Sequence, residues 1–85
     1  MNKKIKYYVE RCGTLYKADI YNDIGWYFYY YNNIDNIWSR SCLGASDIDV
    51  RIIEISDEDA FVIMLEMEKA LTSNYAKELV KQLFK

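Results

Sequence analysis

Two thiols and a run of carboxylates are the side chains of this sequence with the chemistry for catalysis. Cys12 and Cys42 stand 30 positions apart, and Asp57, Glu58 and Asp59 follow one another. A thiol nucleophile is activated by a neighbouring base, usually histidine, and the sequence contains no histidine, which is also the usual zinc ligand. Its three glycines form no phosphate-binding loop. We therefore expect no enzymatic activity, no metal ion, no cofactor, and two free thiols.

The three carboxylates are explained better by a helix start than by a catalytic pair. Ser56 precedes them, and a serine at that place accepts hydrogen bonds from backbone N–H groups of the first turn. Asp59, at the third helical position, matches the capping box in part, and all three charges suit the positive end of the helix dipole. The pattern predicts a helix over residues 57–71. Its apolar stripe is predicted to contain Phe61, Met64, Leu65, Glu68 and Leu71.

A second helix is predicted to follow at the C-terminal end. Residues 72–74 are Thr, Ser and Asn, which are good cap residues, and the apolar side chains then recur at helical spacing. The alternative for the preceding segment is a sixth strand over residues 61–67, since Phe, Val and Ile favour sheets. The strong helix formers over residues 65–71 favour the helix. The predicted apolar face of the second helix consists of Tyr75, Ala76, Leu79, Val80 and Leu83.

The first half of the chain alternates apolar and polar residues between turn signals, as an antiparallel meander does. Four strands are expected near residues 4–10, 14–21, 26–31 and 37–42, and a fifth over 50–55. The fold class is therefore α+β, with an antiparallel sheet of four to five strands and one or two helices packed on one face. We expect one domain, residues 1–85, with the sheet in 1–55 and the helical part in 56–85.

Six consecutive aromatic residues, 26–31, give the clearest indication of a binding surface. Because side chains alternate along a strand, three rings face each side of the sheet. The less polar set, Trp26, Phe28 and Tyr30, is expected against the helices, unless a bulge reverses the two sets. The expected open face carries Tyr27, Tyr29 and Tyr31. Tyrosine is common at protein interfaces, and the alternative is that cross-strand ring pairs only stabilise the sheet.

Negative charge is concentrated in the second half of the chain. Between residues 44 and 68, eight carboxylates accompany a single cation, Arg51, while the whole chain has a formal net charge of −2. Such segregation predicts an acidic surface that meets a basic partner, and the alternative is a helix start with solvated turns. The carboxylates assigned to this surface are Asp47, Asp49, Glu54, Asp57, Glu58 and Asp59.

Nucleic acid is a less favoured partner, although aromatic sheet faces can stack single-stranded RNA. No Lys or Arg stands between Asp19 and Trp38, and phosphate contacts supply most nucleic-acid affinity. A basic edge formed by Lys3, Lys4, Lys6, Arg11, Lys17 and Arg40 is the remaining source of cations. No apolar stretch approaches the ~18 residues of a membrane helix, and no targeting signal is present, so a cytoplasmic protein without membrane contact is expected.

These observations predict a non-catalytic protein-binding module, either an inhibitor or an adaptor. Abundant Asn, Ile, Lys and Tyr, with no proline, suit an AT-rich genome such as that of a low-GC bacterium or its phage. A phage-encoded inhibitor of a host nucleic-acid-handling defence enzyme is the sharpest form of the prediction. The alternatives are a single-stranded nucleic-acid-binding domain and a domain that forms homodimers or larger oligomers through its tyrosine face.

Overall fold

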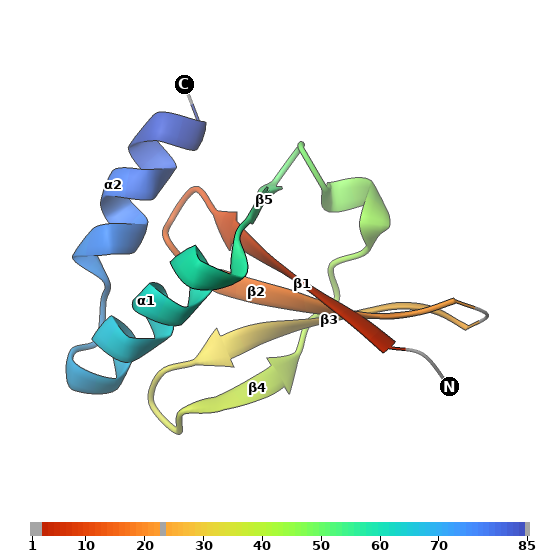
Figure 1. Cartoon of the computed structure of the whole chain (residues 1–85), viewed down its shortest axis with the longest axis horizontal. Coiled ribbons are helices and arrows are strands. Elements are labelled where there is room, and N and C mark those ends of the chain that lie inside the picture. The colour runs from red at the N-terminus through yellow and green to blue at the C-terminus, as the bar shows by residue number, and fades with distance from the viewer. Residues whose placement is uncertain (1–2, 23, 85) are drawn as a thin grey trace.

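A five-stranded antiparallel sheet and two C-terminal helices form the described part of the chain, residues 3–22 and 24–84 of a computed structural model (Figure 1). The sheet order is β4-β3-β2-β1-β5. The α+β prediction is confirmed, and residues 61–67 are helical. The strands are β1 (Lys3–Glu10), β2 (Leu15–Tyr21), β3 (Gly25–Asn32), β4 (Ile37–Arg40) and β5 (Ile52–Ile55). A 3-10 turn, η1 (Ala45–Asp47), precedes β5, and the helices are α1 (Asp57–Lys69) and α2 (Asn74–Leu83).

Strands β1 to β4 form the predicted meander, and β5 returns to pair with the outer side of β1. Two of the connecting turns use glycine at positive φ, Gly13 at 95° and Gly25 at 130°, where a side chain would strain the backbone. Strand β5 begins at Ile52, two residues later than predicted. Asp49 has a φ of 66°, and the Arg51 N–H donates to the Asp47 carbonyl at 2.8 Å, so the preceding residues form a turn.

The two helices cover one end of one sheet face. Figure 1 shows α1 and α2 together on the left, whereas the β2–β3 hairpin extends to the right beyond them. The helices bury four side chains against this end of the sheet, namely Ala60, Ile63, Ala76 and Val80. We call the cluster that they form with the sheet the helix-side core. The sheet contributes Val9, Leu15, Tyr31 and Ile55 to the same core.

The opposite sheet face has a core of its own, covered by the segment between β4 and β5. Leu43 and Ile48, on either side of η1, pack onto buried side chains of four strands. Figure 1 shows this segment across β5 from the helices. We call this cluster the far-side core. Its buried members are Tyr8, Ala18, Ile20, Phe28 and Ile52.

The two ring sets of β3 lie on the opposite faces from those predicted. Tyr31 belongs to the helix-side core, while Phe28 is 1% exposed in the far-side core. The six-residue run keeps its alternation, because each residue from Trp26 to Tyr30 pairs in register with β2. The prediction was wrong because it assumed one covered face. The loop over residues 41–50 covers the other, and the most apolar ring, Phe28, lies beneath it.

Helix α1 is rotated relative to its predicted apolar stripe, and it ends at Lys69 instead of Leu71. Ala60 and Ile63 are buried and Met64 and Met67 pack beside them, because a small Ala60 lets the helix approach the sheet closely. Four members of the predicted stripe are exposed instead, namely Phe61 (63%), Leu65 (46%), Leu71 (73%) and Glu68. For α2, Ala76 and Val80 are buried as predicted, Leu79 and Leu83 pack against the core, and Tyr75 stays 38% exposed.

Ser73 connects the two helices through two hydrogen bonds. Its Oγ accepts from the Ala76 N–H at 3.0 Å as the cap of α2, and donates to Glu66 Oε1 at 2.6 Å. That hydrogen bond, followed by one from the Tyr75 backbone, lowers the pKa of the Glu66 carboxyl. A lowered pKa means that Glu66 contributes stability above its unfolded-state pKa and loses it as the pH falls through the folded-state value.

Ser73→Ala is therefore expected to lower the free energy of unfolding by about 1–2 kcal/mol at pH 7. The serine is 2% exposed, so its two bonding partners would lose a group that water replaces poorly. Urea unfolding followed by circular dichroism measures the change. Thr72→Ala, at the exposed neighbouring position, serves as the control and should stay within about 0.5 kcal/mol of the wild type. Equal losses in the two variants would contradict the cap assignment.

Candidate binding surface

The three tyrosines predicted to bind a partner divide into one core residue and two surface residues. Tyr31 is 6% exposed beneath the helices, and burial raises the pKa of its hydroxyl. Tyr27 and Tyr29 lie on the same face of β3 but closer to the β2–β3 hairpin, where the helices leave the sheet open (Figure 1). Both are half-buried, so part of each ring reaches solvent.

Cations from the two neighbouring strands lie over these rings. The guanidinium carbon of Arg40, on β4, is 5.1 Å from the ring centre of Tyr27 and 5.6 Å from that of Tyr29. The Nζ atom of Lys17, on β2, is 5.3 Å from the ring centre of Tyr29 and 5.2 Å from that of Trp38. These separations are within the range of attractive cation–π contacts. We call this group, Lys17, Tyr27, Tyr29, Trp38 and Arg40, the ring surface.

Sequence reasoning named Lys17 and Arg40 only as part of a basic edge and did not place them over the tyrosine rings, because they come from other strands. Within β3 no Lys or Arg occurs, so the aromatic run looked uncharged. In the folded sheet, Tyr29 is opposite Lys17 on one side and opposite Arg40 on the other. The alternation of β2 and β4 would have placed these cations near the tyrosines once the meander register was known.

The carboxylate of Asp19 partly neutralises the positive charge of the ring surface. It is 7% exposed, with its Oδ1 atom 3.7 Å from Lys17 Nζ and its Oδ2 atom 3.8 Å from Lys3 Nζ. Its Oδ1 atom has no hydrogen-bond partner among the described residues. Three cations and one carboxylate leave this region with two net positive charges, although the whole chain is acidic.

The predicted acidic residues have separate local roles. The Asp47 carboxylate accepts from the Gly44 N–H at 2.9 Å in η1, and the Asp59 N–H donates to Ser56 Oγ at 3.1 Å at the start of α1. Glu54 lies 3.7 Å from Lys6 Nζ. Glu54 is opposite Tyr8 in the sheet and the Asp49 N–H donates to the Ile52 carbonyl at 2.7 Å, so both residues lie beside the far-side core. Burial, followed by Glu54 and Asp49, raises the pKa of Tyr8 to about 12.

Asp57 and Glu58 lie on the helix side instead. Together with Tyr7, Phe61 and Met64 they line an open cavity of about 300 Å³ at the start of α1. Tyr7 joins this cavity to the ring surface, since its ring centre is 6.2 Å from that of Trp38. Burial, then Asp57 and then Asp19, raises the pKa of the Tyr7 hydroxyl, so both carboxylates act on it. One sheet face thus has a basic aromatic region beside an acidic apolar one.

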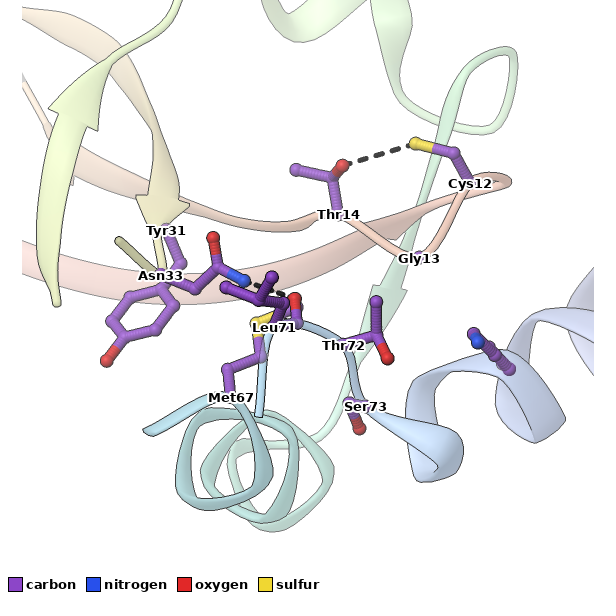
Figure 2. Close-up of a pocket in the computed structure, with 10 residues that line it drawn as sticks. Cys12, Gly13, Thr14, Tyr31, Asn33, Met67, Leu71, Thr72 and Ser73 are labelled. Carbon is purple, nitrogen blue, oxygen red and sulfur yellow. Dashed lines mark hydrogen bonds between the residues drawn. The ribbon is translucent and has the colours of Figure 1, made fainter. Parts of the chain in front are cut away.

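The cavity in Figure 2 lies where the β1–β2 turn, the end of β3 and the α1–α2 connection meet, and its volume is about 200 Å³. Two pairs of its polar groups lie in contact. Cys12 Sγ lies 3.2 Å from Thr14 Oγ1, and Asn33 Nδ2 donates to the Leu71 carbonyl (Figure 2). Cys12 and Cys42 are both free thiols, as predicted. The hydrogen bond from Asn33 to Leu71 joins the end of β3 to the α1–α2 connection, so we interpret this cavity as a structural contact between the helices and the sheet.

No helix within residues 3–22 and 24–84 is long and apolar enough to cross a membrane. The same residues contain no group of three or more His, Cys, Asp or Glu side chains arranged to hold a metal ion. In comparisons with known proteins, no family model, no curated sequence and no solved structure shows a significant match to the chain.

Proposed function

We propose that this protein is a non-catalytic protein-binding module that contacts its partner through the ring surface. The observation that supports this most is the arrangement of Tyr27, Tyr29 and Trp38 with Arg40 on the part of the sheet that the helices leave open. Tyrosine, tryptophan and arginine are the residues that dominate binding energy at protein interfaces. Fixed on strands and in contact with one another, they lose little conformational entropy when a partner covers them.

The acidic residues give the proposal its second element. Asp57 and Glu58 border the same face beyond Tyr7, and Asp49 and Glu54 lie on the opposite side of the molecule. In our proposal Asp57 and Glu58, which lie beside the ring surface, meet basic groups of the partner and guide the encounter. Within this class we favour a small inhibitor or adaptor. A phage-encoded inhibitor of a nucleic-acid-handling host enzyme fits best, because such enzymes carry the basic grooves that an acidic surface complements.

A single-stranded nucleic-acid-binding domain is the second candidate, and one observation favours it. Lys17 and Arg40 supply, beside the rings, the cations that β3 itself lacks. However, a base must stack on the face of a ring, and these cations already lie over the faces of Tyr27 and Tyr29. The net charge of −2 further disfavours a polyanion. A protein partner is therefore the better proposal.

The double variant Tyr27→Ala/Tyr29→Ala is expected to weaken partner binding at least tenfold. Truncating two interface anchors removes about 1–2 kcal/mol each, and about 1.4 kcal/mol is a factor of ten. The partner is first recovered by affinity capture from host lysate and purified, and its affinity is then measured by calorimetry. The control is Tyr30→Ala, which removes a 37% exposed ring from the opposite face of the same strand. Loss of binding in the control alone would contradict the proposed surface.

A further inference from the structure

Arg40, on β4, is a cation of the sheet with no carboxylate partner among residues 3–22 and 24–84. Its neighbours Lys17 and Lys3 share Asp19, and Arg51 has its NH2 group 3.4 Å from Glu10 Oε2. Arg40 forms no ion pair with any residue that the structure describes. Its side chain is exposed, and its guanidinium group makes cation–π contacts with the rings of Tyr27 and Tyr29.

Both rings lie within cation–π distance of the guanidinium. The two separations, 5.1 Å and 5.6 Å, put the guanidinium group against both Tyr27 and Tyr29, and the backbone of Arg40 is held in register opposite Tyr29. A planar guanidinium stacked on aromatic rings keeps its N–H donors at the edge of the plane, available for a second partner. An arginine oriented in this way loses less entropy when it forms two parallel hydrogen bonds with a carboxylate.

We propose that Arg40 binds a carboxylate of the partner protein, so that the ring surface accepts an acidic segment. The inference rests on the proposed protein-binding function and names the chemistry of that contact. Lys17, held over Tyr29 and Trp38, provides a second positive charge next to Arg40. The surplus of two positive charges around Asp19 complements one or two carboxylates.

A short acidic segment suits this region better than a nucleic-acid strand does. Next to the ring surface, beyond Trp38 and Tyr7, lies the cavity that Asp57 and Glu58 line. A longer polyanion would extend into this cavity and be repelled by the two carboxylates. The faces of Tyr27 and Tyr29 are occupied by the chain's own cations, which removes the stacking platform that bases require. A carboxylate needs only the edge of the guanidinium.

The test uses a hexaglutamate peptide, blocked at both ends, titrated at low salt into the full-length protein labelled with nitrogen-15. We expect chemical-shift changes centred on Tyr27, Tyr29, the Trp38 indole and the Arg40 side chain. Arg40→Gln should weaken the affinity about fivefold, which corresponds to one exposed charge pair. Arg40→Lys retains the charge without the planar group, so its affinity for the peptide should lie between those of the wild type and Arg40→Gln. Arg51→Gln, at an exposed arginine outside the ring surface, is the control and should bind as the wild type does.

Three outcomes would overturn the inference. Shifts spread over many lysines, equal in the wild type and Arg40→Gln, would show unspecific charge attraction. Binding of a ten-residue oligothymidylate that exceeds hexaglutamate binding at the same ionic strength, and that depends on Arg40, would assign the surface to phosphates. Absence of both interactions would also refute it. If the partner still depended on Tyr27 and Tyr29 in that last case, the protein-binding function would stand and only the role of Arg40 would fail.

Discussion

Phe28→Ala is expected to leave most of the protein unfolded at room temperature. Phe28 is 1% exposed and its ring centre lies 5.9 Å from that of Tyr8 and 6.1 Å from that of Trp26. Truncating a buried phenylalanine removes about 3–5 kcal/mol from the free energy of unfolding, through lost burial and the cavity that remains. An 85-residue domain without disulfides has only a few kcal/mol in total. Urea unfolding monitored by circular dichroism measures the loss.

Tyr30→Ala is the matched control for this prediction. Tyr30 lies on the same strand and the same face, two residues further on, but it is 37% exposed. Its truncation should lower the free energy of unfolding by about 1 kcal/mol or less. If Phe28→Ala behaved like this control, the segment that carries Leu43 and Ile48 would not bury the far side of the sheet. The partially recovered stability of a Phe28→Leu variant would further separate packing from ring-specific contacts.

The order and type of the elements follow from local signals in the sequence. Glycine and asparagine turns separate four alternating segments, and these became β1 to β4 in meander order. Ser56 and Ser73 both accept the N–H of the third helical residue, which is the pattern used to predict where α1 and α2 begin. Turns and caps depend on residues close together in the chain, and this is why they were predictable.

The facing of the elements was not predictable in the same way. Alternation in β3 fixed which rings share a face, but not which face the helices cover. That choice depended on the loop over residues 41–50, whose Leu43 and Ile48 showed no regular pattern that would identify a cover. In α1, the choice of Ala60 and Ile63 over Phe61 and Leu65 depends on close approach to the sheet, which composition alone does not show.

The candidate surface was predicted in part for a similar reason. The aromatic run predicted an open tyrosine face, and Tyr27 and Tyr29 do reach the surface while Tyr31 is buried. The cations that accompany them, Lys17 and Arg40, are 12 and 11 residues away from Tyr29 along the chain and adjacent to it only across the sheet. A charge count along the sequence therefore showed no cation within the tyrosine strand, whereas the folded sheet places two cations beside it.

Tyr31→Ala is expected to reduce stability far more than Tyr27→Ala does, although both remove a tyrosine from the same face of β3. Tyr31 is 6% exposed and packs edge-on against Trp38 with ring centres 5.2 Å apart, so its truncation should remove about 3 kcal/mol or more. That corresponds to a fall in melting temperature of at least about 12 °C for a domain of this size. Tyr27 is half-buried at the open end of the sheet, and its loss should lower the melting temperature by less than about 8 °C.

The conservative variant Tyr31→Phe completes the separation of stability from binding. The Tyr31 hydroxyl makes a long hydrogen bond to Asn36 Oδ1, at 3.4 Å, so its removal should change the melting temperature little and leave partner affinity unchanged. Tyr27→Ala should show the opposite pattern, a folded protein with weakened binding. Calorimetry of both variants against the purified partner, beside thermal melts, tests this. Weakened binding in Tyr31→Phe would mean that the helices move aside to expose this ring, because in the closed fold they cover it.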